Sequence, residues 1–393
     1  MSNAYGMPVV AIIGDGQLAR MMQTAAIELG IETRVLAGSN EASAAQVIAD
    51  ARLGDYTSLE DLEAATEGTD AVTFDHEHVP NEHLQVLIDN DLDPEPRPSA
   101  LIYAQDKLEQ RQRLNALGAP VPEFAAINTA EDAEAFWEQV DGQVCLKATR
   151  GGYDGKGVWF PASLSELLSL VEELDLPLMG ERKVPFDREL SAMVARGRTG
   201  QIAAWPVVES IQDGGICRVA ISPAPGLDEK LEREARELAS RIAQELDVTG
   251  VLAVELFVTG DTLLVNELAM RPHNTGHWTQ DGCVTSQFEQ HLRAVLDWPL
   301  GATEPTAPVT VMVNTLGGDT DPEMPMAERV IEVMRRYPQA KIHLYGKGHR
   351  PGRKMGHVNV AADTVVEARA VAEDAAHFIV NATWRDESAA GEE

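Results

Sequence analysis

The feature that most constrains the fold is an apolar run, VLAVELFV at residues 251–258, which carries a single carboxylate, Glu255. A short apolar run bounded by turn residues predicts a β-strand. The turn sequence TGD follows at 259–261, and a second strand leads into NELAMRPHNTGHWT at 266–279. That stretch holds Glu267 with an arginine, two amides and two histidines, His273 and His277, which could be substrate contacts or hydrogen-bonded core residues. The sequence therefore predicts a two-stranded hairpin with polar side chains crowded at its exit end.

The hairpin brings two carboxylates and an amide into one small region. Its turn leaves two registers open, in which Glu255 faces either Asn266 or Glu267. Carboxylate and amide oxygens are the ligands that Mg²⁺ prefers, and nucleotide phosphates complete its shell. An acid within an apolar strand needs a partner when it is buried, so packing alone explains Glu255 poorly. We therefore expect an enzyme that uses ATP with Mg²⁺, or with Mn²⁺ in its place, and that binds the metal through Glu255 and Glu267.

Strands and helices alternate over the first hundred residues. Apolar strand patterns occur at 8–14, 33–38 and 70–75, and residues 17–30 have helical periodicity that ends at a glycine. A short buried strand, a helix and another strand are typical of a parallel sheet. The proline-rich segment 92–100 interrupts regular structure. We expect the first domain to end there.

The turn GDGQLA at residues 14–19 joins the first strand to the first helix. It fits a glycine-rich phosphate-binding turn, although a tight turn without a ligand has the same pattern. A dinucleotide site also needs an acid about 20 residues later. That region ends no strand with an acid, and Glu41 comes too late. The missing acid therefore argues against an NAD site, and Gln17 is better interpreted as a ligand to one phosphate or sugar.

A second glycine-rich segment, GGYDGKG at 151–157, follows the strand VCLKA at 144–148. It lacks the Walker A arrangement, but four glycines and a lysine can wrap a phosphate chain. An ordinary flexible hairpin is the alternative. Lys147 lies among apolar neighbours, so it needs an anionic partner, and a nucleotide phosphate would serve. Thr129 and Ser163, each followed three residues later by an acid, predict helix N-caps around this unit.

The last part of the chain carries a basic cluster. A strand is expected near 310–314, a helix at 326–337 and a closing helix at 364–380. Between the helices, RPGRKMGH at 350–357 places Arg353 and Lys354 in a turn. A solvated hairpin would explain them, but basic residues are scarce in this chain, so the cluster favours an anion site.

Composition excludes several classes of protein. A formal net charge of −31 opposes binding to a nucleic-acid backbone and indicates a strongly solvated surface. No apolar run approaches the roughly 20 residues of a membrane span, and no secretory signal is evident. Three widely spaced cysteines indicate a reducing compartment without a disulfide framework, so we expect a cytoplasmic protein.

Taken together, six motifs resemble one family. The chain resembles ATP-grasp enzymes over nearly its whole length, and most closely the 5-(carboxyamino)imidazole ribonucleotide synthases of purine biosynthesis. The resemblance rests on GDGQLARM, TFDHEHVP, KATRGGYDGKG, VELFV, NELAMRPHNTGHWT and RPGRKMGH. It implies a multidomain α/β and α+β protein with the ATP-grasp fold. The implied units are a Rossmann-like pre-ATP-grasp domain at 1–105, an ATP-grasp domain at 106–305 with a lid at about 120–188, and a small C-terminal domain at 306–393.

The resemblance also implies a reaction. ATP phosphorylates bicarbonate to carboxyphosphate, and the amine of aminoimidazole ribonucleotide then takes the carboxyl group, through CO₂ released in the closed site. The products are the N-carboxylated ribonucleotide, ADP and phosphate. A homodimer is implied as well. Two alternatives from other classes of protein stay open. One is an NAD-dependent oxidoreductase, for which the GDGQLA turn alone argues, and the other is a nucleotide-binding protein without catalysis. A third is another ATP-grasp ligase acting on a purine intermediate.

The resemblance assigns roles to particular residues. The implied nucleotide contacts are Lys107, Lys147, Gly152, Tyr153, Asp154, Gly155, Lys156, Gly157, Val158, Glu181, Arg182, Lys183, Val184, Glu189, Gln212, Asn266 and Glu267. The implied contacts to the ribonucleotide and the reacting carboxyl group are Gly16, Gln17, Leu18, Glu77, Tyr153, Asp154, Arg271, His273, Asn274, Arg353 and Lys354. Asp154, Arg271 and Lys354 are expected to be catalytic. Asp75 lies where relatives carry part of an acid-aromatic-acid pattern, so its role stays open. Ser210, where relatives often have Asn, is assigned nothing.

Overall fold

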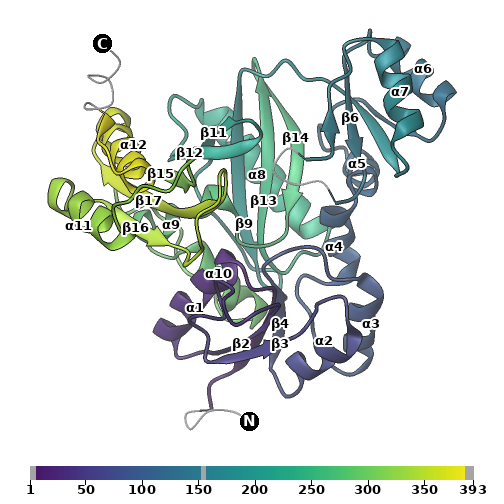
Figure 1. Cartoon of the computed structure of the whole chain (residues 1–393). Helices are drawn as coiled ribbons and strands as arrows, with labels where there is room; N and C mark the ends of the chain where they lie inside the picture. Colours follow the sequence, from purple (N-terminus) through teal and green to yellow (C-terminus); the bar gives the residue numbers. More distant parts are fainter. Residues whose placement is uncertain (1–5, 152–155, 386–393) are drawn as a thin grey trace.

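Three β-sheets organise the protein, as a computed structural model shows (Figure 1). The structure describes residues 6–151 and 156–385. A parallel sheet contains the N-terminal strands, and a larger sheet joins most of the remaining strands. A small antiparallel sheet, termed the lid sheet, lies within the segment that the sequence predicted as a lid. In Figure 1 the helices α6 (Ala130–Gln139) and α7 (Leu164–Glu173) lie at the right of the view, and the C-terminal helices α11 (Met326–Arg336) and α12 (Val365–Asn381) lie at the left.

The N-terminal sheet has the order β3-β2-β1-β4, with all neighbouring strands parallel. This confirms the parallel sheet predicted from the alternating pattern, and the structure adds the short strand β3. Gly30 ends the first helix in a left-handed conformation, as its position predicted. The elements are β1 (Val9–Ile13), α1 (Gln17–Leu29), β2 (Glu32–Ala37), β3 (Asp50–Leu53), α2 (Leu59–Thr66), β4 (Ala71–Phe74), α3 (Asn81–Asp89), α4 (Pro98–Gln105) and α5 (Lys107–Ala116).

The lid sheet has the order β5-β8-β6-β7. Thr129 caps α6 in a capping box with Asp132, and the Ser163 hydroxyl accepts a hydrogen bond from the Glu166 N–H at the start of α7. Both predicted N-caps are therefore confirmed. The elements are β5 (Phe124–Ile127), α6 (Ala130–Gln139), β6 (Val144–Ala148), β7 (Val158–Trp159), α7 (Leu164–Glu173) and β8 (Leu178–Arg182).

The large sheet has the order β14-β13-β9-β11-β12-β15-β17-β16, and β10 pairs with β9. Strand β15 pairs with β12, so the C-terminal strands extend the same sheet that holds the carboxylate hairpin. The elements are β9 (Arg188–Arg196), β10 (Ile202–Ala204), β11 (Val208–Asp213), β12 (Ile216–Ser222), α8 (Glu229–Glu245), β13 (Gly250–Thr259), β14 (Thr262–Ala269), η1 (Asn274–Gly276), α9 (Thr279–Gly282), α10 (Gln287–Val295), β15 (Val309–Leu316), α11 (Met326–Arg336), β16 (Lys341–Leu344), β17 (Lys354–Ala362) and α12 (Val365–Asn381).

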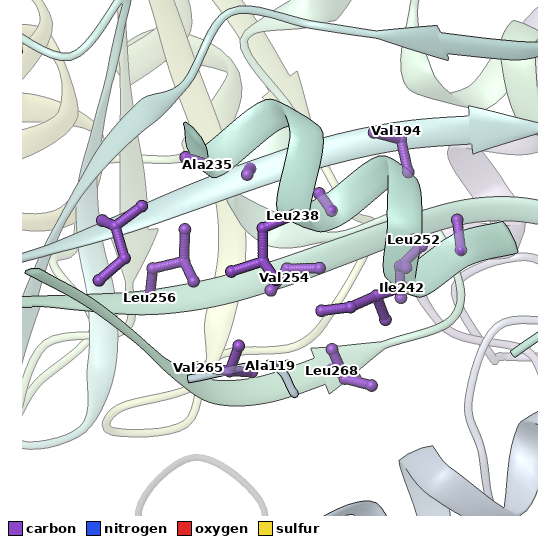
Figure 2. Close-up of a cluster of buried hydrophobic side chains, with 14 of the residues drawn as sticks. Ala119, Val194, Ala235, Leu238, Ile242, Leu252, Val254, Leu256, Val265 and Leu268 are labelled. Atoms are coloured by element: carbon purple, nitrogen blue, oxygen red, sulfur yellow. The ribbon is translucent and has the colours of Figure 1, made fainter. Parts of the chain in front are cut away.

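The main core lies where α8 packs on one face of the hairpin and of β9 (Figure 2). Leu238 and Ile242 of α8 meet Leu252 and Val254 of β13, and all four side chains are buried. Burial of aliphatic side chains contributes roughly 1.5–3 kcal/mol for each. This packing holds the hairpin in place, so its polar end is presented by a rigid support. In the described segments, no helix is long and apolar enough to cross a membrane.

A buried histidine connects the N-terminal sheet to the large sheet. The backbone N–H of Val251 on β13 donates to Nδ1 of His291, and Nε2 of that ring lies 2.7 Å from Oγ1 of Thr73 on β4. Burial lowers the pKa of His291 to about 3, so the ring is neutral. Because Nδ1 accepts, the single proton resides on Nε2 and is donated to Thr73. The contact fixes α10 between the two sheets.

Candidate active site

The register of the carboxylate hairpin is now defined. Glu255 on β13 lies opposite Glu267 on β14, while Leu256 pairs with Val265. Asn266 is therefore an extra residue on β14, at a β-bulge. A bulge bends its strand and redirects side chains. Of the two registers that the sequence left open, the structure has the one in which the carboxylates face each other.

Each of these carboxylates is held by a basic side chain. Nζ of Lys107, the first residue of α5, forms an ion pair with Glu267. Burial alone would raise the pKa of Glu267, but the Lys107 charge and hydrogen bond lower it, so the group is ionised. Nε2 of His273 lies 3.2 Å from Oε1 of Glu255. On the neighbouring strand β9, burial and the charge of Glu255 raise the pKa of Glu189 to about 7. Negative charge is thus concentrated at this end of the hairpin.

The donor set suits a hard cation that is also bound by a substrate. Within the described ranges no group of three or more His, Cys, Asp or Glu residues could hold a metal ion by itself. Mg²⁺ is commonly bound by one or two carboxylates, with substrate phosphates and water completing its octahedron. Two facing carboxylates with an adjacent amide fit that requirement better than they fit a metal cage made by the protein alone.

A buried ion-pair network joins the lid to the hairpin. Glu181 on β8 pairs with both Lys147 on β6 and Arg111 on α5. Arg111 is 1% exposed and also donates to the backbone carbonyl of Asn266. Burial would raise the pKa of Glu181, but the two cations lower it to about 2. The anionic partner that Lys147 requires is therefore a protein carboxylate, and Arg111 is a residue that the sequence did not single out.

The other predicted nucleotide contacts are spread over the lid and the large sheet. Gly152, Tyr153, Asp154 and Gly155 lie outside the described residues. Lys156 is exposed, the Gly157 carbonyl accepts from the Ala148 N–H, and Val158 pairs with Lys147. At the end of β8, Arg182 pairs with Glu123 at 2.6 Å, and Nζ of Lys183 lies over the Phe160 ring. Val184 follows the strand, and Gln212 lies on β11 beside Cys217 of β12.

A second cluster forms where the N-terminal sheet meets the hairpin. Nε of Arg271 lies 2.8 Å from Oε2 of Glu77. Gln17, in the first turn of α1, accepts a hydrogen bond from Nζ of Lys347. Both pairs connect the N-terminal sheet with segments far away in the chain. The structure therefore brings together two predicted substrate contacts, Arg271 and Glu77, and adds Lys347 beside a third.

Asp75 occupies the space beneath the glycine-rich turn. Its carboxylate accepts a hydrogen bond from the N–H of Gly16, which is the N-cap of α1. A Cβ atom at Gly14 would lie 2.1 Å from Oδ1 of Asp75, so this position needs glycine. Burial raises the pKa of Asp75 to about 6. The turn thus binds an anion from its own chain, and the side chain of Leu18 is buried in the adjoining core.

Basic side chains from the C-terminal segment face this cluster. Lys354 is the first residue of β17, and Arg353 precedes it and donates to the carbonyl of Gly348 at 3.1 Å. Burial and the charges of Arg353 and Lys354 lower the pKa of Lys347 to about 8. The segment is held against the N-terminal sheet by Gln46, whose side chain donates to the Gly346 carbonyl at 2.8 Å. Three cations therefore lie close together in an acidic protein.

The two histidines of NELAMRPHNTGHWT have different surroundings. His273 points toward Glu255 and is partly exposed. His277 is 1% exposed, and its ring stacks on Phe288 and lies tilted against the ring of His357. Burial holds the pKa of His277 well below its ordinary value. Of the two roles that the sequence left open for each histidine, His277 therefore has that of a core residue. Asn274 begins the 3-10 helix η1 beside His273.

Three family descriptions match successive parts of the chain. They are the ribonucleotide synthetase preATP-grasp domain at 7–105, the ATP-grasp domain at 112–288 and the phosphoribosylaminoimidazole carboxylase C-terminal domain at 310–371. The chain is also 59% identical over 389 residues to N5-carboxyaminoimidazole ribonucleotide synthase of Corynebacterium ammoniagenes, and the match covers 97% of this chain and 94% of that one. The chain belongs to this synthase family.

Solved structures of the N5-carboxyaminoimidazole ribonucleotide synthase family have the same fold. The enzyme from Thermus thermophilus is 38% identical with a TM-score of 0.85, over 96% of this chain and 99% of that one. The synthase from Aspergillus clavatus, solved with ADP and 5-aminoimidazole ribonucleotide, is 30% identical with a TM-score of 0.86, over 96% and 99%. The ATP-grasp fold expected from the motifs is confirmed. The oxidoreductase alternative is wrong, because GDGQLA lies in the preATP-grasp domain.

Proposed function

We propose that this protein is an ATP-dependent carbon–nitrogen ligase that carboxylates 5-aminoimidazole ribonucleotide in purine biosynthesis. The reaction gives 5-(carboxyamino)imidazole ribonucleotide, ADP and phosphate. The observation that carries the proposal is the pair of facing carboxylates, Glu255 and Glu267, with Arg271 at the exit of the same hairpin. Family membership supports the substrate, since the relatives are named for this product. The facing acids also disfavour a nucleotide-binding protein without catalysis.

ATP is proposed to bind between the lid and the hairpin. Lys107 and Lys147 reach this space from α5 and β6, and both already contact carboxylates there. Glu255, Glu267 and the Asn266 amide would hold Mg²⁺, or Mn²⁺ in its place, which would offset the charge of the phosphates. Glu189 lies on β9 close to Glu255 and is proposed to bind the ribose. Its pKa of about 7 leaves it partly protonated near neutral pH, so it can donate as well as accept.

Bicarbonate activation is assigned to the junction between the two clusters. Carboxyphosphate hydrolyses in water, so the site must exclude solvent while this intermediate exists. Arg271 carries a permanent positive charge and is fixed by Glu77, which suits it to stabilise negative charge on the carboxyphosphate. We propose Asp154, outside the described residues, as the group near the amine.

The ribonucleotide is proposed to bind between the first helix and the C-terminal segment. Lys347, Arg353 and Lys354 supply positive charge for its phosphate, and Gln17 lies next to them. Glu77, His273 and Asn274 are proposed to contact the ribonucleotide as well. Cationic side chains bind phosphate through charge-assisted hydrogen bonds, which are about twice as strong as neutral ones.

We further propose a homodimer located in the cytoplasm. The three-domain division at 1–105, 106–305 and 306–393 is part of the same proposal. Family resemblance supports the dimer, and the three cysteines, all buried and free, fit a reducing compartment. Sedimentation velocity at micromolar concentration would reveal a monomer if the dimer proposal is wrong.

One assay separates this activity from that of another ATP-grasp ligase. ADP release is measured with ATP, Mg²⁺ and bicarbonate, with and without aminoimidazole ribonucleotide. We expect rapid ADP release only when the ribonucleotide is present. Equal rates without the ribonucleotide, or with a different purine intermediate in its place, would contradict the substrate assignment.

Replacing Lys354 by Ala should weaken ribonucleotide binding much more than ATP binding. A hydrogen bond to a charged group contributes about 1.5–3 kcal/mol, so KM for the ribonucleotide should rise roughly 10- to 100-fold. KM for ATP should change by less than about twofold. Lys341→Ala, which removes an exposed lysine on β16, is the matched control. Equal effects of Lys354→Ala on the two KM values would refute the placement of the phosphate site.

A further inference from the structure

Gln287, the first residue of α10, is bound to both backbone groups of His273. The His273 N–H donates to Oε1 of Gln287 at 2.7 Å, and Nε2 of Gln287 donates to the His273 carbonyl at 2.8 Å. The Gln287 side chain is completely buried. A side-chain amide that pairs with both groups of one peptide residue fixes the position of that residue, because the two bonds restrain its rotation as well as its distance.

The remaining proton of the Gln287 amide is also used. Nε2 lies 2.9 Å from Nδ1 of His277. His277 is buried and has a pKa well below its ordinary value, so its ring is neutral and Nδ1 can accept this proton. An amide NH₂ has two protons, and here one goes to His273 and the other to His277. The orientation of the Gln287 amide is therefore defined by its three contacts.

Fixing the His273 backbone determines where its ring points. Nε2 of the ring lies 3.2 Å from Glu255, and Nδ1 lies 2.9 Å from Oγ1 of Thr275. Thr275 is in turn 2.7 Å from Oγ of Ser191 on β9. The ring is thus held from both nitrogens, but its distance from Glu255 depends on the backbone that Gln287 holds. A shift of about 1 Å at a catalytic group can lower the rate by 10²-fold.

We propose that Gln287 is a positioning residue for the carboxylation reaction. It acts through His273, and it aligns the segment 271–274 with the carboxylates at the end of the hairpin. The inference rests on the proposed function, in which His273 and its neighbours bind the reacting groups. Gln287 itself contacts neither of the facing carboxylates in the described structure, which distinguishes it from the residues assigned above.

The same helix supplies a matched control. Gln290, one turn later on α10, is also completely buried and makes the same pair of bonds with another residue. The Gly301 N–H donates to Oε1 of Gln290 at 2.7 Å, and Nε2 of Gln290 donates to the Gly301 carbonyl at 2.9 Å. Loss of either amide leaves two backbone groups unpaired, so both changes should destabilise the fold. Gln287→Met also removes the donor to Nδ1 of His277, so its loss of stability should be equal or somewhat larger. Only the Gln287 change should move His273.

The experiment compares Gln287→Met with Gln290→Met in the full-length protein. Methionine has nearly the volume of glutamine but forms no hydrogen bonds of comparable strength. We expect Gln287→Met to lower kcat about 10- to 100-fold, with KM for ATP changed by less than about twofold. Gln290→Met should keep kcat within about threefold of wild type, even if its Tm falls equally. Equal kcat values for two folded variants would overturn the proposal.

A second variant keeps the shape of Gln287 and tests the hydrogen bonds directly. In Gln287→Glu, a protonated carboxyl group can accept from the His273 N–H and donate to its carbonyl, whereas a carboxylate cannot donate. Burial next to the neutral His277 ring raises the pKa of such an acid toward neutrality. The kcat of this variant, divided by that of wild type, should fall at least about fivefold between pH 6 and pH 9. A constant ratio would overturn the proposal.

These measurements also separate two kinds of failure. Wild-type turnover in the same assay reports whether aminoimidazole ribonucleotide is the substrate. The ratio between the Gln287 and Gln290 variants reports on positioning. If wild type consumes the ribonucleotide but the two methionine variants behave alike, the inference about Gln287 is wrong and the proposed function stands.

Discussion

Replacement of Glu267 by Gln is expected to lower kcat by about 10³-fold. Glu267 faces Glu255 across the hairpin and pairs with Lys107, so the change removes one of two proposed metal ligands and the partner of a lysine. A bound metal ion contributes several kcal/mol of charge stabilisation, and each 1.36 kcal/mol is tenfold in rate. Steady-state ADP release over a range of Mg²⁺ concentrations measures both effects. The variant should also need more Mg²⁺ for half-maximal activity.

Asp261→Asn is the control for this experiment. Asp261 is an exposed carboxylate at the turn of the same hairpin, at the end away from Glu267. Its replacement changes the net charge equally and should leave kcat within about twofold of wild type. If Glu267→Gln retained near-normal kcat at saturating Mg²⁺, the metal role of this carboxylate would be refuted. If both variants lost activity equally, the loss would reflect net charge or folding and not metal binding.

Replacement of Arg111 by Met is expected to lower the free energy of unfolding by about 3 kcal/mol. Removing one partner of a buried ion pair typically costs about 3–5 kcal/mol, because the other charge is left in a poor environment. The lower end applies here because Glu181 keeps Lys147 as a partner. The Asn266 carbonyl also loses its donor, so the bulge beside the proposed metal site should loosen. Urea unfolding at pH 7 measures the loss of stability.

The stability difference between wild type and Arg111→Met should depend on pH in a definite direction. Folding lowers the pKa of Glu181 to about 2 from an ordinary value of 4.5. The stabilisation is therefore complete above about pH 4.5 and disappears as the pH falls toward 2. The difference between wild type and Arg111→Met should shrink over that range. A difference that stayed constant between pH 5 and pH 3 would contradict the role of the ion pair.

Arg113→Met provides the control for Arg111. Arg113 lies two residues later on α5, and its guanidinium donates to the Glu245 carbonyl at 3.1 Å at an exposed position. Surface interactions of this kind contribute at most about 1 kcal/mol. A loss for Arg113→Met as large as that for Arg111→Met would show that any arginine on this helix is equally important.

Much of the fold could be predicted because its signals are local. The alternating apolar strands and the helix with a glycine stop predicted the N-terminal parallel sheet, and Thr129 and Ser163 marked helix starts through a single hydroxyl. Short-range hydrogen bonds and periodicity suffice for such features. The order of the large sheet could not be predicted in this way. Pairing of β15 with β12 joins distant segments, and no local pattern specifies it.

The residues of the candidate site also differ in whether a local signal in the sequence marks them. Glu255 and Lys147 were conspicuous in the sequence, because a charged residue in an apolar strand is unusual. Arg111 was not, because it lies in a helix rich in charged residues, and only burial against the lid makes it different from its neighbours. Lys347 lies three residues before RPGRK, and its glycine-rich context was the one signal that could have found it.

By itself, the sequence determined the family, the reaction class and the presence of two acids at one end of a hairpin, since motifs and periodicity are properties of short segments. The tertiary structure decided the hairpin register, the separate surroundings of His273 and His277, and the partners of Lys147 and Asp75. Those outcomes depend on which distant groups share a buried space. Burial and charge pairing there are set by packing between sheets, which no single segment encodes.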